Sequence, residues 1–177
     1  AVLQSLPPLQ SERFYELADQ SFAAGSQIVD METSSGTTGP KKRRLISNAD
    51  DVSETTFLAE LFRVCGIGAS DSVACVDTGP LTLMVSFTRA LEEMGVAEAY
   101  AYSAGPDAEA VLEQLASLAP TVMVSIPSIL DRLAGALRES RPGAVWSDLR
   151  AVVYVGEPLS SRTRFLLEHR LGVQVFG

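Results

Sequence analysis

Apolar and polar residues alternate with two different periods along residues 71–177. Short runs rich in Val, Ala and Tyr, bounded by Gly, Pro, Ser or Asp, predict strands, and longer stretches with apolar residues three and four apart predict helices. The predicted strands are residues 71–77, 100–102, 121–126, 149–155 and 173–176. The predicted helices are a segment that follows Thr78-Gly79-Pro80 and ends at Met94, then residues 108–118, 127–139 and 160–171.

This strict exchange of strand and helix predicts an α/β fold with a mostly parallel sheet flanked by helices, because neighbouring parallel strands need a crossover. Ligands of such sheets bind outside the carboxyl ends of the strands. We therefore expect Asp77-Thr78-Gly79, Ser125-Ile126-Pro127 and Val155-Gly156-Glu157-Pro158 to form the rim of one cleft.

The first 48 residues have a different pattern. Leu6-Pro7-Pro8-Leu9 precedes a predicted helix over residues 11–24, a strand over residues 27–33 and a strand-like segment over residues 43–47. A capped helix over residues 49–65 follows, ends at Gly66, and carries its apolar residues largely on one face: Val52, Phe57, Leu58, Leu61, Phe62 and Cys65. We predict one α/β domain over residues 1–177, with the first helix, strand and loop in residues 1–48 and the alternating core in residues 49–177.

Composition narrows the classes of function. A chain of 177 residues with 46% hydrophobic residues is long and apolar enough for a folded domain with its own core. The net charge of -8 argues against a nucleic-acid partner, and no apolar run is long enough for a membrane span. Cys65 and Cys75 lack metal-ligand spacing, so we expect no metal ligands among them and interpret them as buried reduced thiols of a cytoplasmic protein.

Three further features have structural interpretations. His169 is the only histidine and lies in a charged helix, so we expect it to be exposed and not catalytic. Trp146 is expected to pack over the sheet. The arginines at 162, 164 and 170 are expected to form the solvated face of the last helix.

The stretch with the most specific chemistry is Glu32-Thr33-Ser34-Ser35-Gly36-Thr37-Thr38-Gly39-Pro40-Lys41-Lys42-Arg43-Arg44. Glycines allow a loop to turn its N–H groups toward an anion, hydroxyls add donors, and the cations that follow supply charge for phosphate oxygens. The spacing is not that of a Walker loop. On the residues alone, a basic surface linker and a nucleic-acid contact through residues 41–44 stay open as alternatives.

The run Ser34-Ser35-Gly36-Thr37-Thr38-Gly39, followed by Lys42, resembles the phosphate loop of adenylate-forming enzymes, the acyl- and aryl-coenzyme A ligase superfamily. The two serines look most like the phenylacetate–coenzyme A ligase branch. Gly156-Glu157-Pro158 resembles the family segment that borders the adenine and the acyl group, although Val155 stands where the family has a glycine. The resemblance spans nearly the whole chain but only the N-terminal core portion of a family member.

The resemblance implies an ATP-binding and AMP-binding ligase. ATP and Mg²⁺ would be the cofactors, a small carboxylic acid the substrate, and coenzyme A or an acyl carrier protein the thiol acceptor. Residues 34–39 would hold the phosphates and Lys42 would neutralise them. The sequence assigns no catalytic residue and no metal ligand.

The family's magnesium-binding glutamate, ribose-binding aspartate and C-terminal lysine have no counterpart in these 177 residues. We therefore expect the 177 residues alone to be nearly inactive. They would be a portion of a longer enzyme, an enzyme completed by a partner chain, or a truncated non-catalytic relative that acts as a binding or assembly module.

Overall fold

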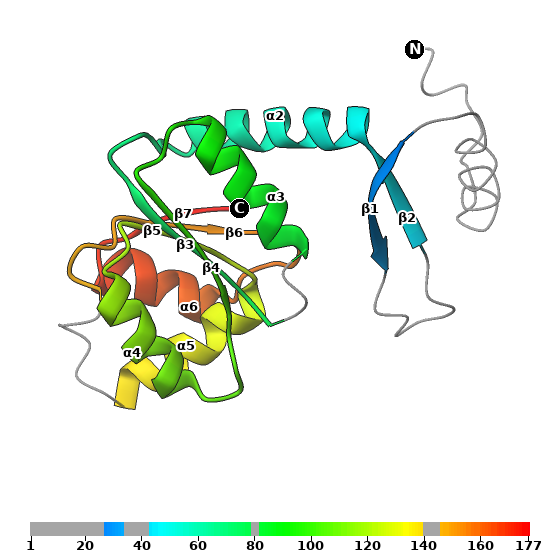
Figure 1. Cartoon of the computed structure of the whole chain (residues 1–177). Coiled ribbons are helices and arrows are strands. Elements are labelled where there is room, and N and C mark those ends of the chain that lie inside the picture. The colour runs from blue at the N-terminus through cyan, green and yellow to red at the C-terminus, as the bar shows by residue number, and fades with distance from the viewer. Residues whose placement is uncertain (1–26, 34–42, 79–81, 140–145) are drawn as a thin grey trace, which may run out of the picture. The chain divides into compact units, whose positions relative to one another are not determined.

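The computed structural model of the chain describes residues 27–33, 43–78, 82–139 and 146–177 (Figure 1). The chain divides into two compact units, residues 1–54 and 55–177, which are described separately. The helix expected over residues 11–24 and the segment Leu6-Pro7-Pro8-Leu9 before it lie outside the described residues. Whether the whole chain behaves as one domain stays a prediction.

The described part of the first unit begins with a hairpin. Strands β1 (Ile28–Thr33) and β2 (Arg43–Ser47) pair antiparallel, with Thr33 opposite Arg43 and Met31 opposite Leu45. The register shifts between Ile28 and Asp30, as in a β-bulge. Both strands were expected from the sequence, but their pairing was not.

Helix α2 (Asn48–Val64) starts with a reciprocal cap. The backbone N–H of Asp50 donates to Ser47 Oγ at 3.2 Å, and the Ser47 N–H donates back to Asp50 Oδ2 at 3.0 Å. This is a capping box, which satisfies N–H groups that a helix start otherwise leaves unpaired. Gly66 terminates the helix as predicted, with a φ of +72°. The N–H of the following residue, Ile67, donates to the carbonyl of Phe62 at 3.0 Å.

The predicted apolar face of α2 is partly wrong. Leu58, Phe62 and Cys65 are buried, but Phe57 is 67% exposed and Val52 is 56% exposed. Adjacent residues on a helix point about 100° apart, because 3.6 residues make one turn. From residue 55 on, α2 belongs to the second unit, and there only the stripe that contains residues 55, 58, 59, 62 and 65 is buried.

The second unit contains a parallel five-stranded sheet with the order β4-β3-β5-β6-β7. Its strands are β3 (Ser72–Asp77), β4 (Glu98–Ser103), β5 (Val122–Ser125), β6 (Ala151–Tyr154) and β7 (Gln174–Phe176). The chain first moves from β3 to β4 and then crosses back to the other side of β3 at β5. This reversal makes the carboxyl ends of β3 and β5 a topological switch point, where sheets of this class bind ligands.

The helices of this unit are α3 (Thr82–Glu93), α4 (Ala108–Leu118), α5 (Pro127–Glu139) and α6 (Ser161–Phe165), with a π-helical turn η4 (Leu166–Arg170) after α6. The bounds of α4 and α5 match the prediction from the sequence. The continuous helix expected over residues 160–171 is corrected to α6 plus η4, because a wider turn inserts at Leu166.

Two apolar cores lie on the two faces of the sheet (Figure 1). On one face α4, α5 and η4 pack against alternate strand residues such as Val76, Met123 and Val152. On the other face α2 and α3 pack against the residues in between, such as Cys75 and Val124. The alternation follows from the period of two in a strand, and each large side chain that is fully buried contributes roughly 1.5–3 kcal/mol.

The predicted fold class, a mostly parallel sheet flanked by helices, is thus confirmed. Cys65 and Cys75 are both free and buried, as expected. Burial raises the pKa of the Cys75 thiol to about 12, so this thiol stays protonated and inert.

Candidate nucleotide site at the carboxyl edge of the sheet

The hairpin in the first unit closes the predicted phosphate loop. Residues 34–42, which include Ser34 to Gly39 and Lys42, lie outside the described residues, so their predicted role is untested. The structure describes both ends of the loop: Thr33 and Arg43 are paired in the β1–β2 ladder.

In the second unit, three of the expected rim segments lie side by side. Strands β3, β5 and β6 are neighbours, so Asp77, Ser125 and Tyr154 end at the same edge (Figure 1). The buried Ser125 hydroxyl donates to the carbonyl of Val76 at 2.8 Å, and the Val155 N–H donates to the carbonyl of Ser125 at 3.2 Å. These bonds hold the strand ends together. Gly79, the third residue of the first rim segment, lies outside the described part.

The segment after β6 has the backbone of a binding turn. Gly156 has a φ of +94°, and a Cβ placed there would meet nothing within 4 Å. The glycine is therefore needed for its backbone conformation, and open space lies beside it. Glu157 and Pro158 are exposed, and Ser160 caps α6 by accepting the N–H of Thr163 at 3.2 Å.

The contacts between Arg164 and Tyr154, at the end of β6, were not predicted from the sequence, and we call this pair the Tyr154–Arg164 clamp. Arg164 donates from Nη2 to the Tyr154 Oη at 3.0 Å, and its guanidinium lies 5.7 Å from the centroid of the ring. The other side of the guanidinium pairs with Glu168 at 2.9 Å. A side chain at Gly177 would collide with the Tyr154 ring, so this ring covers the backbone that follows β7.

The arginines of the last helix are thus not one solvated face. Arg162 and Arg170 are exposed as expected, but Arg164 is half-buried and paired on both sides, and this corrects the prediction. No local pattern marks Arg164, because its partner Tyr154 is on another element. The expectations for two other residues are confirmed: His169 is exposed and lies against the Phe165 ring at 4.8 Å, and Trp146 is buried in the core.

A second polar cluster lies at the opposite, amino edge of the sheet. Asp71 is 5% exposed and accepts two hydrogen bonds from Arg150, from Nε at 2.9 Å and from Nη2 at 2.6 Å. It also accepts the hydroxyl of Thr121 at 2.7 Å and the N–H of Gly68 at 2.9 Å. Burial alone would raise the pKa of Asp71, but these four donors together hold the pKa below its usual value.

We interpret this cluster as structural, because its groups satisfy one another. Arg150 also donates to the carbonyl of Gly66 at 2.8 Å, which ties β6 to the end of α2. Asp71 and Arg150 are 79 residues apart in the chain, so no spacing rule could have paired them.

Metal ligands are not apparent in the part of the chain that the structure describes, where no three His, Cys, Asp or Glu side chains gather around one point. Among the same residues, no helix is long and apolar enough to cross a membrane.

No protein-family model and no curated protein matches the sequence. Solved structures do match it. A structure of 2-hydroxyisobutyryl-CoA ligase in complex with 2-HIB-AMP and CoA has a TM-score of 0.76 at 22% identity, over 95% of this chain and 38% of that chain. The complex of VinN with L-aspartate has a TM-score of 0.61 at 21% identity, over 93% and 41%.

A long-chain-fatty-acid-CoA ligase from Archaeoglobus fulgidus has a TM-score of 0.59 at 19% identity, over 81% of this chain and 28% of that chain. At these identities the similarity shows the fold, which matches the N-terminal portion of adenylate-forming ligases as the sequence predicted. The chain spans about two fifths of the length of the 2-hydroxyisobutyryl-CoA ligase structures that it matches.

Proposed function

We propose that this chain forms the phosphate- and adenine-binding portion of an ATP-dependent ligase that activates a carboxylic acid. The observation that carries the proposal is the position of Gly156-Glu157-Pro158. The segment matched from sequence to the family's adenine-binding turn follows a strand at the carboxyl edge of a sheet with the ligase fold. Its glycine has a positive φ and open space beside it.

The reaction would have two steps. A carboxylate oxygen attacks the α-phosphorus of ATP, and the bond between this phosphorus and the oxygen that bridges to the β-phosphate breaks. Pyrophosphate departs, and the other product is an acyl- or aryl-adenylate. The sulfur of a thiol, on coenzyme A or a carrier protein, then attacks the acyl carbon, and AMP leaves with the bonding electrons. In both steps charge develops on phosphate oxygens, so positioned donors and cations lower the barrier.

The residues of this chain would act in the first step mainly on the leaving group. The donors of Ser34, Ser35, Gly36, Thr37, Thr38 and Gly39 would bind the β- and γ-phosphates, and Lys42 would neutralise the charge of the departing pyrophosphate. Gly156, Glu157 and Pro158 would border the adenine and the acyl group. Mg²⁺, when bound to the phosphates, would supply further positive charge, and its protein ligands are not assigned here.

The departure from the family at Val155 favours the non-catalytic alternative, but the packing of this side chain weakens that objection to a nucleotide site. Resemblance to the family places a glycine here, and a branched side chain on the adenine side would crowd the base. Val155 is instead half-buried and packs against the core between the sheet and α2–α3. Its methyl groups are therefore accommodated by the core.

The proposed ligase has three further properties to assign: its branch of the family, its acid and its acceptor thiol. The paired Ser34-Ser35 favours the phenylacetate–coenzyme A ligase-like branch, and the acid stays a small carboxylic acid of unassigned type. We also propose that the catalytic groups that these residues lack come from a longer polypeptide or from a completing chain. The chain's length relative to the matched ligases supports this proposal.

The test is exchange of labelled pyrophosphate into ATP, measured on the longest reading frame that contains these 177 residues. Lys42→Ala and Thr38→Ala should each lower the exchange rate at least tenfold, about 1.4 kcal/mol of transition-state stabilisation. Arg63→Ala is the matched control for Lys42→Ala, because it removes one exposed cation whose ion pair among the described residues is with Glu60 on the same helix. Equal rates in both loop variants and the control would rule out the loop's role.

Calorimetry with ATP and Mg²⁺ on the 177-residue chain distinguishes a nucleotide-binding portion of a ligase from a non-catalytic module. Heat at millimolar nucleotide that disappears in Lys42→Ala supports a nucleotide-binding portion. No exchange in the complete frame, together with no heat from the chain, would instead identify a non-catalytic binding or assembly module.

A further inference from the structure

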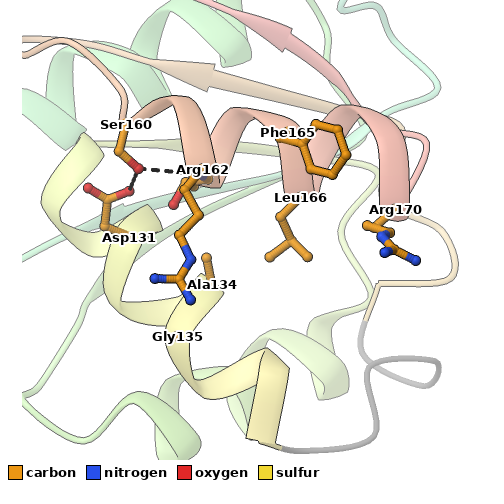
Figure 2. Close-up of a pocket in the computed structure, with 9 residues that line it drawn as sticks. Asp131, Ala134, Gly135, Ser160, Arg162, Phe165, Leu166 and Arg170 are labelled. Carbon is orange, nitrogen blue, oxygen red and sulfur yellow. Dashed lines mark hydrogen bonds between the residues drawn. The ribbon is translucent and has the colours of Figure 1, made fainter.

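A groove lies between α5 and the pair α6–η4, and Ser160, two residues after Pro158, lines one end of it (Figure 2). Its volume is about 840 Å³, and it is open to solvent along one side. Ala134 and Gly135 line it from α5, and Leu166 lines it from η4. Figure 2 shows Arg162 and Leu166 extending from their helix toward α5.

The floor of the groove is apolar and leaves room for another side chain. Gly135 lies inside α5, where glycine is less favourable than alanine, and a Cβ there would meet nothing within 4 Å. Phe165, beside the groove, is 55% exposed although it is a large apolar residue. Its only ring contact among the described residues is the one with His169. Phe165 therefore adds exposed apolar surface to the groove.

The rim of the groove is cationic. Arg162 and Arg170 both line it and are exposed, and neither has an ion pair or a hydrogen bond among the described residues. Arg164, between them, is already paired with Glu168 at 2.9 Å. In a chain with a net charge of -8, two exposed arginines on either side of an apolar floor form a local site of opposite sign.

The carboxylate in the groove does not neutralise these arginines. Asp131 lies at the end next to Ser160 and accepts the Ser160 hydroxyl at 2.7 Å. It therefore disfavours a second acidic group at that end only. Arg162 and Arg170 are eight residues apart in the sequence, which is about two helical turns along α6 and η4.

From these observations we propose that the groove binds an acidic amphipathic helix of a partner protein. Acidic residues two helical turns apart on the partner would reach Arg162 and Arg170, and an apolar residue midway between them would lie against Leu166 and Gly135. A helix in an apolar groove between two helices is a common mode of peptide recognition. The open side argues against a small molecule, because small ligands are usually 70–90% enclosed.

The probe is a fluorescein-labelled peptide of about 15 residues, long enough to form a helix on the surface. It carries glutamates eight residues apart and a leucine midway on the same face. A second peptide has the same composition in scrambled order. Fluorescence anisotropy with the 177-residue chain should show saturable binding of the first peptide and at least tenfold weaker binding of the second.

Two variants test the rim. Arg162→Glu and Arg170→Glu should each weaken binding of the patterned peptide about tenfold, because a favourable charge contact becomes a repulsion. Arg63→Glu is the matched control, with the same change of charge on α2, and should bind the peptide as the wild type does. Circular dichroism verifies that all three keep the wild-type helix content.

A third variant, Gly135→Gln, fills the floor without changing charge, and it should also abolish binding while it preserves the fold. Equal binding of patterned and scrambled peptides, or equal loss in Arg63→Glu, would overturn the proposal. So would a concentration-dependent dimer that both rim variants dissociate, since the occupant would then be a second copy of this chain. Binding to anionic lipid vesicles that exceeds binding to the peptide would overturn it in favour of a membrane surface.

Discussion

The two edges of the five-stranded sheet use polar residues in opposite ways. At the amino edge, Asp71, Arg150 and Thr121 pair with one another and with the backbone, and Asp71 is almost fully buried. At the carboxyl edge, Gly156, Glu157 and Pro158 are exposed, and no hydrogen bond or ion pair of the Glu157 side chain occurs within the described ranges.

Strands β3, β5 and β6 are only four to six residues long. The polar groups that stabilise the sheet lie at one end of these strands, and the groups available for binding lie at the other end. The amino edge ties β3, β5 and β6 together with a satisfied network, so its polar groups have little capacity left for a ligand. The carboxyl edge is held by backbone bonds and by the buried Ser125 hydroxyl, and its outer groups stay available. Such division is typical of α/β sheets, in which function lies at the carboxyl ends.

The substitution with the largest expected effect on stability is Asp71→Ala at the amino edge. It removes the buried carboxylate that accepts hydrogen bonds from Arg150, Thr121 and Gly68, and the expected loss is about 3 kcal/mol in the free energy of unfolding. Urea denaturation followed by circular dichroism measures it. A loss below about 1 kcal/mol would mean that the amino edge does not hold the strands together.

Acid should remove part of the same stability. Because the pKa of Asp71 is lowered in the folded state, the unfolded chain takes up this proton first as the pH falls. The contribution is therefore complete above the unfolded pKa of about 3.9 and is lost as the pH falls through the folded pKa. Wild type and Asp71→Asn should differ most in urea midpoint near neutral pH and converge in acid; a constant difference would contradict this assignment.

At the carboxyl edge, Gly156→Ala should cost about 1–2 kcal/mol, since a residue with a Cβ disfavours a φ of +94° even without a steric contact. Gly105→Ala is the matched control, because its Cβ would also meet nothing within 4 Å and its φ is not positive. Urea midpoints of both variants give the comparison. Equal stabilities would show that the turn does not require glycine.

The smallest expected effect on stability is that of Glu157→Gln, within about 0.5 kcal/mol, because the side chain is exposed. Its effect on pyrophosphate exchange should be severalfold if this edge borders the adenine. Glu113→Gln, an exposed position on α4, should change neither quantity. Unchanged pyrophosphate exchange in Glu157→Gln would contradict a functional role of Glu157 at the carboxyl edge.

The match between sequence and structure is best where local chemistry acts alone. The bounds of α4 and α5 were predicted because Asp107 accepts the N–H groups of residues 109 and 110 and because Pro127 starts its helix. The loop of residues 34–42 was singled out by its hydroxyls, glycines and cations, and the structure adds only that a paired hairpin closes it.

The sequence by itself determined the α/β class, the alternation of strands and helices, the helix caps and the candidate phosphate chemistry. These depend on residues within a few positions of one another. The tertiary structure alone decided the strand order, which stripe of α2 is buried, the Asp71–Arg150 network, the Tyr154–Arg164 clamp and the groove beside Gly135. These depend on contacts between residues far apart in the chain, and local patterns carry no information about which distant partners meet.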